Sequence, residues 1–407
     1  MKAAAERILS RARASGAEEA EVYLSRGTEF TVRVYKQEIE SLTSAESRGI
    51  GLRTLREHRV GFSYTSDADN ASLDSLVDPQ RKIDFALEME RQAISIDPRV
   101  RRVSEAVYSD GSGQVEIYNS RGLEVEYQRS VAYGVLETIA EQDSEMQSGF
   151  AFTHGRDMDA LDLAEVAREA VENAAGLLGA TRVPTARVPV VLHPHAAAMI
   201  LGILSSSFSA DAVLKGRSLL AGRVGQSVAS DLVTITDDAR LPDGLASRPF
   251  DGEGVPAQRN ELIKAGVLRG YLHNTYTAHR SGAQSTASAV RSYKSVPEVG
   301  VTNLVLTPGG ISREALIGRV SNGLHVSQLH GLNTVNPISG EFSLGLTGHW
   351  IEQGRLTRPV RELTVAGNVI DLLKRVVAIA DDLRFVFAGG FNGSPTILIE
   401  ELPVGGL

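Results

Sequence analysis

Histidine is the side chain from which this sequence can most readily build a chemical site, because its 407 residues include nine histidines and no cysteine. The lack of cysteine excludes disulfides, cysteine-ligated zinc, iron–sulfur clusters and a thiolate nucleophile. His193-Pro194-His195 is the only H-x-H pair, and alternate positions of an extended strand can place two imidazoles on one face to bind a metal ion. The proline, the adjacent helix start and the lack of a nearby carboxylate predict a solvated surface turn instead.

Other residue patterns that could support catalysis are weaker. His273 and His279 have a spacing that suits neither helical nor strand ligands, which indicates polar strand-end residues. The segment 340–345 reads G-x-x-S-x-G, which is too long for the strained turn that exposes a nucleophilic serine. Ser205-Ser206-Ser207 has no visible base partner. No glycine-rich phosphate-binding motif is present, which disfavours nucleotide binding.

Composition and charge indicate an ordinary globular protein that does not bind nucleic acid. The net charge is −8, the sequence pI is about 5.7, and no run of five or more basic residues is available to neutralise phosphates. The first 21 residues mix charges with alanines, unlike a signal peptide. The longest apolar run, residues 196–204, is about half the length that a bilayer requires. We therefore expect a cytoplasmic protein without membrane contact.

Hydrophobic periodicity predicts two N-terminal domains, covering residues 1–100 and 101–185. In the first, a helix over 3–15 ends at Gly16, and a period of two over 21–64 predicts an antiparallel sheet. Its turns are expected near Gly27, Arg48-Gly49 and Glu57-His58, and residues 67–95 return to helix. In the second, strands at 115–118, 123–140 and 149–154 precede a helix over 159–178 and a polar junction at 180–187.

A third, β-rich domain is expected over residues 186–407. It begins with a strand at 188–192 and an apolar helix over 196–214, followed by one more helix over 370–380. Its other predicted elements are short strands at 232–235, 268–271, 301–306, 344–351, 363–365 and 396–402. Scattered glycines favour a barrel-like sheet with an inner face available to a ligand. The fold class is therefore α+β, with N-terminal antiparallel sheet domains flanked by helices and a C-terminal β-rich, barrel-like domain with a few helices.

Several segments resemble the TldD/PmbA (TldE) peptidase family, and together they cover nearly the whole chain. They are Ser47–Arg53 with Val60–Ser66, Phe250–Gln258, Leu262–Leu268, Tyr276–His279, Ser339–Glu352, Glu362–Asn368 and Gly393–Glu400. The last of these looks like the TldE branch, since TldD would carry a metal-associated cysteine there.

The apolar helix over 196–214 gains a meaning from this resemblance. By itself, the spacing of Ile200, Leu204 and Phe208 predicts only a buried core helix. In the resemblance, the zinc motif H-E-x-x-x-H of the TldD branch falls on residues 202–207, where this chain has Gly202, Ile203 and Ser207. Glycine and isoleucine cannot coordinate zinc, and a neutral serine is a poor ligand. The resemblance therefore implies a vacated active site that binds no metal, with zinc in a TldD-like partner.

What the resemblance implies for function is a heterodimer or higher assembly in which TldD hydrolyses and this chain completes a chamber for extended, unfolded peptides. Such peptidases trim leader peptides or degrade disordered proteins. A sheet edge can hold an extended peptide through its main chain. The candidate lining residues are Leu329, His330, Gly331, Asn333, Gly340 and Ser343. The alternative is a self-sufficient homodimeric hydrolase that recruits His193 and His195, or His325 and His330, to a different metal or catalytic constellation.

Overall fold

The structure is a computed structural model that describes residues 2–66 and 78–406, and these divide into two compact units. Unit 1 contains the described residues up to Gly176, together with Arg248–Pro256 and Val290–Glu298. Unit 2 contains Leu177–Ser247, Ala257–Ala289 and the described residues from Val299 onward. Two loops from the C-terminal half of the sequence thus belong with the N-terminal sheet. The division into three domains at residues 100 and 185 stays a prediction.

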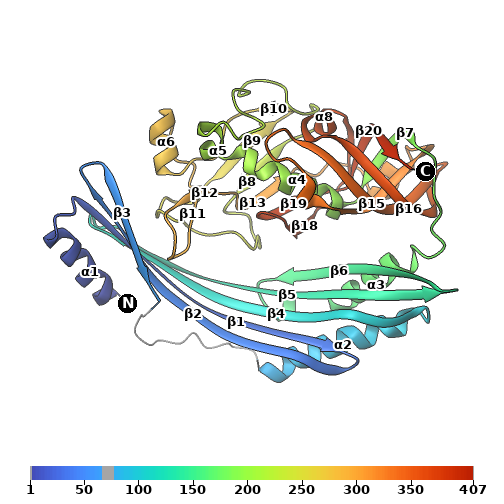
Figure 1. Ribbon diagram of the computed structural model, residues 1–407, viewed down its shortest axis with the longest axis horizontal. Coiled ribbons are helices and arrows are strands. Elements are labelled where there is room, and N and C mark those ends of the chain that lie inside the picture. Colours follow the sequence, from blue (N-terminus) through green and yellow to red (C-terminus); the bar gives the residue numbers. More distant parts are fainter. Residues whose placement is uncertain (1, 67–77, 407) are drawn as a thin grey trace. The chain divides into compact units, whose positions relative to one another are not determined.

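Unit 1 is built on one long, curved antiparallel sheet with the strand order β3-β2-β1-β4-β5-β6 (Figure 1). Its strands are β1 (Glu19–Tyr35), β2 (Glu38–Arg56), β3 (Arg59–Thr65), β4 (Val100–Asn119), β5 (Glu124–Gln142) and β6 (Glu145–Gly155). Its helices are α1 (Lys2–Ala14), α2 (Pro79–Ile96) and α3 (Leu163–Ala175), with a 3₁₀ turn η1 (Met158–Ala160) before α3.

Two of the predicted turns in this sheet are wrong. β1 runs straight through Gly27, which pairs with Ser47 on one side and Gly113 on the other, and β2 runs through Arg48-Gly49. The chain reverses instead at Lys36-Gln37, where both residues have positive φ, as two-residue hairpin turns require. The predicted turn at Glu57-His58 is confirmed and has the same geometry.

The sheet of unit 1 has a helix face and an opposite face. Even-numbered residues of β1, such as Val22 and Leu24, are buried with Ala5 of α1, and Thr138 of β5 donates a hydrogen bond to the Ala170 carbonyl of α3. α2 packs on the same side, since a β-carbon on Gly134 of β5 would contact its Phe85 and Met89. Odd-numbered residues of β1, including Tyr23 and Gly27, therefore lie on the opposite face, because strand side chains alternate.

The helix predicted over 159–178 begins later than expected. Asp162 caps α3 by accepting a hydrogen bond from the Glu165 N–H at 2.9 Å, so the helix starts at Leu163. Asp157 caps only the short turn η1. The helix predicted over 67–95 lies partly outside the described residues, and its described part, α2, is confirmed.

Unit 2 contains a closed five-stranded barrel and a second sheet. The barrel runs β16-β15-β14-β7-β20 and closes through a β16–β20 pairing, with β17 added beside β20. Its strands are β7 (Ala186–Leu192), β14 (Asn322–His330), β15 (Glu341–Glu352), β16 (Arg355–Asn368), β17 (Val376–Ile379) and β20 (Ile397–Gly405). The second sheet runs β10-β9-β8-β13-β19-β18, with strands β8 (Ile235–Asp238), β9 (Arg259–Lys264), β10 (Val267–Leu268), β13 (Asn303–Leu306), β18 (Arg384–Phe387) and β19 (Phe391–Ser394).

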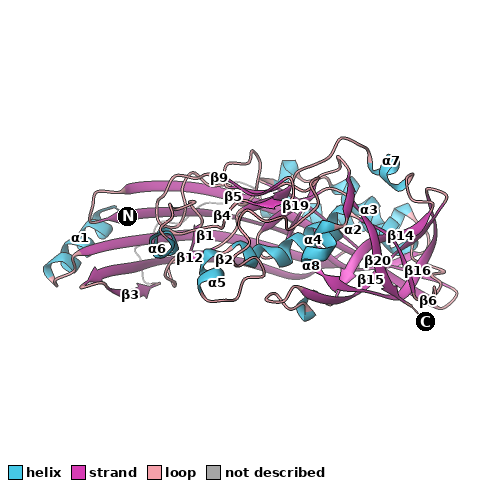
Figure 2. Ribbon diagram, turned by 90° about the horizontal axis from the view of Figure 1, so that it is seen from above, coloured by secondary structure: helices cyan, strands magenta, loops and turns pink. Residues whose placement is uncertain are grey.

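The remaining elements of this half of the sequence are short. They are α4 (Pro194–Ser205), η2 (Ser206–Phe208), α5 (Ala210–Leu214), α6 (Thr275–Ser281), α7 (Arg313–Ile317), η3 (Leu332–Thr334), α8 (Val369–Lys374) and the two-stranded pair β11 (Ala289–Val290) and β12 (Glu298–Val299). Strands dominate this part of the chain (Figure 2), with α4 packed against β18 and β19 and α8 against β16 and β20. The α+β class and the C-terminal barrel are confirmed. No helix of the described chain is both long and apolar enough to cross a bilayer.

The barrel interior is a packed core. Alternate residues of all five strands, for example Val190, Leu324, Leu344, Val365 and Val404, join one hydrophobic cluster. A cluster shared by every strand of a closed barrel occupies its interior. Hydrophobic side chains therefore fill the space that the sequence offered to a ligand.

Two predicted helices of unit 2 are shorter than expected. The helix over 196–214 is interrupted, because Ser209 leaves the helical conformation and caps α5 separately. The helix over 370–380 stops at Lys374, and residues 376–379 pair with β20 as β17. The strand expected at 232–235 begins only at Ile235. The first boundary is set locally, by the hydrogen bond from the Ala212 N–H to Ser209 Oγ, whereas strand partners distant in sequence set the other two.

Candidate functional site

The helix α4 is fixed by its first residues and by its apolar side chains. His193 is the N-cap, its ring accepting a hydrogen bond from the His195 N–H at 3.3 Å, and Pro194 occupies the first turn, where a missing N–H costs nothing. Ile200, Leu201 and Leu204 then enter the large core of unit 2. Of the positions singled out from the sequence, Gly202 and Ile203 therefore lie on a helix whose neighbours are core residues, and Ser207 lies in the 3₁₀ turn η2 that follows it.

Gly202 is a point of close contact between α4 and the segment joining β18 to β19. A β-carbon added there would lie 2.6 Å from the Ala388 carbonyl oxygen, 2.7 Å from the Ala388 β-carbon and 3.0 Å from Asn392 Nδ2. Contacts below 3.0 Å to backbone atoms require the backbone to move. A side chain has no room at this position because the segment joining β18 to β19 occupies the space.

Ile203 and Ser207 also have packing roles. Ile203 is half-buried against the unit 2 core, and Ser207 has 1% of its surface exposed. The carbonyl of Ser207 accepts a hydrogen bond from Ser218 Oγ at 2.6 Å, and Ser205 Oγ donates one to the Gly202 carbonyl at 2.6 Å. Within residues 2–66 and 78–406, no group of three or more His, Cys, Asp or Glu side chains is arranged to hold a metal ion.

The pair His193 and His195 is not the solvated turn expected from the sequence. β7 and β14 pair in parallel, so the His193 N–H donates to the Val326 carbonyl at 3.0 Å. The rings of His193 and His325 meet edge to face with centroids 6.1 Å apart, and Arg313 lies 3.2 Å from His325 Nε2. Burial, reinforced by Arg313, holds the pKa of both imidazoles well below the usual range. Both rings are therefore neutral at physiological pH.

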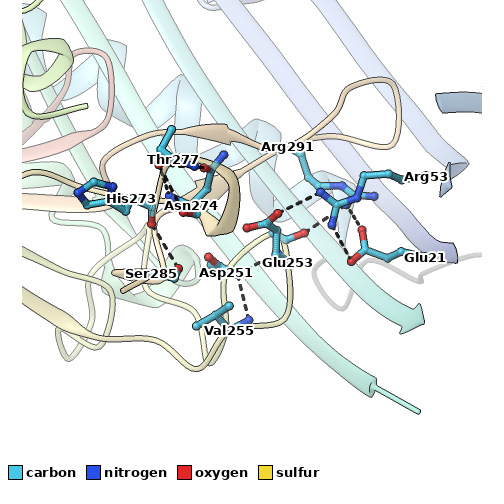
Figure 3. Close-up of polar contacts among 11 residues, drawn as sticks. Glu21, Arg53, Asp251, Glu253, Val255, His273, Asn274, Thr277, Ser285 and Arg291 are labelled. Atoms are coloured by element: carbon cyan, nitrogen blue, oxygen red, sulfur yellow. Dashed lines mark hydrogen bonds and ion pairs between the residues drawn. The ribbon is translucent and has the colours of Figure 1, made fainter. Parts of the chain in front are cut away.

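His273 is also buried rather than placed at a polar strand end. His273 directly precedes α6, whose N-cap Asn274 forms a capping box with Thr277. The carbonyl of His273 accepts a hydrogen bond from Ser285 Oγ at 3.4 Å (Figure 3). Burial lowers the pKa of its imidazole. The expectation at His273 is thus wrong, since the turn closed by Ser285 encloses it, whereas His279 is exposed at the end of α6.

The candidate peptide-binding residues surround the turn between β14 and β15. Leu329 is buried, while His330 and Asn333 are exposed around Gly331, which opens η3 with φ of 80°. At the far end of the turn Gly340 is buried with φ of 75°, and Ser343 is exposed on β15. Thr334 Oγ1 ties the turn together by donating to the Gly331 carbonyl at 2.7 Å. The structure thus brings these residues together.

A second polar cluster, in unit 1, escaped the sequence-based reasoning. Arg53 contacts Glu253 at 3.0 Å and Glu21 at 3.2 Å, and Arg291 forms a further ion pair with Glu21 (Figure 3). Asp251 shapes the loop by accepting hydrogen bonds from the N–H groups of the next residues, including Glu253 at 2.8 Å. The segment Phe250–Gln258 stood out in the sequence, but its charge partners are some 200 positions away.

Aromatic side chains close this cluster. Phe250 meets Tyr127 edge to face at 5.1 Å between ring centroids, and the Arg291 guanidinium lies 4.4 Å from the centre of the Tyr23 ring. Tyr293 covers Gly49 and Gly51 so closely that a β-carbon on either glycine would overlap it. The two loops are therefore integral parts of the N-terminal sheet structure.

Comparison with known proteins gives consistent results along the chain. Three family models match: the PmbA/TldA metallopeptidase C-terminal domain over residues 185–406, the central domain over 73–178 and domain 1 over 20–95. Metalloprotease PmbA of Escherichia coli O157:H7 is 29% identical over 310 residues, covering 76% of this chain and 66% of that protein. A PmbA homologue of Haemophilus influenzae is 25% identical, covering 90% and 88%.

Two solved structures share the fold over nearly their whole length. One, described as a modulator of a DNA gyrase from Thermotoga maritima, has a TM-score of 0.90 and 27% identity, covering 98% of this chain and 99% of that one. The other, TldE from Thermococcus kodakarensis, has a TM-score of 0.91 and 23% identity with the same coverage.

Proposed function

This chain belongs to the PmbA/TldD metallopeptidase family, and we propose that within it the chain is the TldE-like, non-catalytic subunit of a TldD/TldE zinc metallopeptidase. It binds no zinc of its own and completes a chamber that receives extended, unfolded peptides. Hydrolysis takes place on a TldD-like partner that carries the intact zinc motif. The substrates are leader segments or disordered polypeptides in the cytoplasm.

The contact of Gly202 with Ala388 is the observation that carries this proposal. A catalytic zinc needs three protein ligands and an open position for water. The first motif position has neither a ligand nor room for one, because a β-carbon would lie 2.6 Å from the Ala388 carbonyl oxygen. Ile203 packs against the hydrophobic core of unit 2, and Ser207 is buried. Restoring the motif would therefore require the β18–β19 segment to move as well as three side chains to change.

The exposed turn between β14 and β15 supports the peptide-holding part of the proposal. His330 and Asn333 offer polar side chains to a passing main chain, and Gly331 leaves the backbone accessible. A peptide held mainly through its backbone is bound with little regard to sequence, which suits the processing of unfolded substrates. The net charge of −8 is a further reason to prefer a polypeptide over a nucleic acid as the ligand.

Reconstitution tests this function directly. The purified chain is expected to hold less than stoichiometric zinc by elemental analysis and to leave an unfolded peptide intact. Adding a TldD-like subunit with an intact H-E-x-x-x-H motif should restore cleavage and yield a stable complex in mass measurement. One tightly bound zinc per chain, or cleavage by the chain alone, contradicts the proposal.

One observation favours the alternative of a self-sufficient homodimeric hydrolase, namely the contact between the His193 and His325 rings. In that case His193 and His195, or His325 and His330, would serve a different metal or catalytic constellation. Activity of the purified homodimer that disappears in His193→Ala would support this alternative. Equal activity of the wild type and the variant would remove the histidine from any mechanism.

A further inference from the structure

Unit 1 has a pocket of about 410 Å³ on the face of its sheet opposite the helices. The floor of the pocket is the part of the sheet at its bottom, and the register of the strands explains why few side chains project there. Gly27 of β1 pairs with Gly113 of β4, which in turn pairs with Arg129 of β5, so two adjacent strands contribute no side chain at this level. A β-carbon on Gly113 would find only ordinary contacts, the nearest at 3.8 Å, so the space above it is open.

Arginines outnumber carboxylates among the residues that line the pocket. Arg26, Arg129 and Arg291 stand against Glu29 and Asp110, and Asp110 is paired with Lys82. Arg129 is exposed on β5, and Arg291 and Tyr23 line the same pocket. Burial raises the pKa of the Tyr23 phenol to about 12, and the Arg291 guanidinium lies 4.4 Å from the centre of the Tyr23 ring. The pocket therefore favours an anionic guest.

Arg291 has unused hydrogen-bonding capacity. Its side chain has no exposed surface, and Nη1 is engaged with Glu21, yet Nε and Nη2 have no hydrogen-bond partner in the described structure. Buried guanidinium N–H groups are normally satisfied, and those left without a partner call for an explanation such as a missing ligand. A carboxylate is the group whose two oxygens match the spacing of two guanidinium N–H donors.

We propose that this pocket binds the carboxylate of an extended peptide, with Arg129 and Arg291 as the charged donors and the Gly27–Gly113 floor seating the main chain. The inference rests on the proposed function only in taking the ligand to be a peptide. It assigns a binding site to unit 1, separate from the turn that holds His330 and Asn333 in unit 2. The carboxylate can come from the C-terminus or from an acidic side chain.

Calorimetric titration of the full chain, without any catalytic partner, tests this site. The probes are an N-acetylated pentapeptide of alanine and glycine with a free C-terminal carboxylate, its C-terminal amide, and the amide with one central glutamate. The free acid is expected to bind at least about tenfold more tightly than the plain amide, the usual range for a charge-assisted pair. Tight binding of the glutamate peptide would identify a side chain as the source, and weak binding would identify the C-terminus.

Two pocket variants and one control variant test whether the peptide binds in this pocket. Arg129→Gln should weaken binding of the free acid about tenfold, and Gly113→Leu should abolish it by filling the floor. Arg101→Gln, an exposed arginine elsewhere on β4, is the matched control and should bind as the wild type does. Equal affinity for all three probes, no binding of any of them, or unchanged binding by both pocket variants overturns the proposal. Because no hydrolysis is measured, these results are independent of the reconstitution outcome.

Discussion

Glu21 and Arg291 form an ion pair between residues 270 positions apart, with 9% of the glutamate side chain exposed and none of the arginine. Glu21 also binds Arg53, so one carboxylate serves two guanidinium groups. Such a pair ties the loop 290–298 to β1. Removing one partner of a buried pair costs far more than the pair itself contributes, since the other charge stays buried.

Glu21→Gln should therefore destabilise the protein by about 3–5 kcal/mol, measured as the free energy of unfolding in urea. Glu19→Gln on the same strand is the control, because Glu19 pairs with Arg121 at the surface and such pairs contribute about 1 kcal/mol or less. An equal decrease in the free energy of unfolding in the two variants would show that the ion pairs of Glu21 stabilise the protein no more than a surface ion pair does.

Gly202→Ala should be destabilising although alanine favours helices. The added β-carbon meets the Ala388 backbone, and overpacking of this kind costs about 1–3 kcal/mol. Gly270→Ala is the matched change, since a β-carbon there has no neighbour within 4 Å. Thermal unfolding of both variants checks the prediction, and a Gly202→Ala protein as stable as the wild type would contradict the close contact.

The neutral histidines predict a loss of stability in acid. The pKa of His193 and of His325 is depressed in the folded protein, so below the unfolded pKa of about 6.5 only the unfolded chain takes up their protons. Stability is thus fully present above that pH and falls as the pH drops toward the folded pKa, by up to about 1.4 kcal/mol per pH unit for each histidine.

Replacing one of these rings should flatten that dependence. His325→Leu is expected to show a shallower decline in the free energy of unfolding between about pH 6.5 and 4.5 than the wild type. His279→Gln, at an exposed position, should leave the slope unchanged. A slope in His325→Leu identical to that of the wild type would show that this ring is not buried in its neutral form.

The turn between β14 and β15 gives a prediction for peptide binding. The double change His330→Ala with Asn333→Ala removes two exposed side chains and should leave the melting temperature unaltered. Affinity for an unfolded peptide should fall several-fold, in keeping with the loss of about 1 kcal/mol per neutral hydrogen bond. Fluorescence anisotropy with a labelled peptide measures this, and unchanged affinity would exclude the turn from the binding surface.

The sequence predicted the kind of element better than its extent. Alternation in β1 and the Gly16 stop of α1 depend on neighbours along the chain, and the structure confirms both. The turns placed at Gly27 and at Arg48-Gly49 were wrong because glycines commonly mark turns, whereas here they lie within paired strands. Their neighbours in space, Gly113 and Tyr293, lie far away in the sequence.

The candidate sites show the same limit. The residue types at Gly202, Ile203 and Ser207 were readable, but the packing of Ala388 against Gly202 was not, since no local pattern links positions 202 and 388. His193 was interpreted as solvated because the parallel pairing of β7 with β14, which encloses it, is invisible in its own segment. A buried charge cluster such as Glu21 with Arg291 leaves no periodic signal at all.

The assignment of residues 248–256 and 290–298 to unit 1 has a consequence for biosynthesis. Strands β1 to β6 are synthesised long before Phe250 and Arg291. During translation the N-terminal sheet therefore lacks Arg291, the residue that contacts Glu21 and Tyr23 in the folded protein. An N-terminal fragment that ends near residue 180 would lack these parts permanently. Expression trials should accordingly keep the chain whole rather than cut it where its sequence suggests a joint.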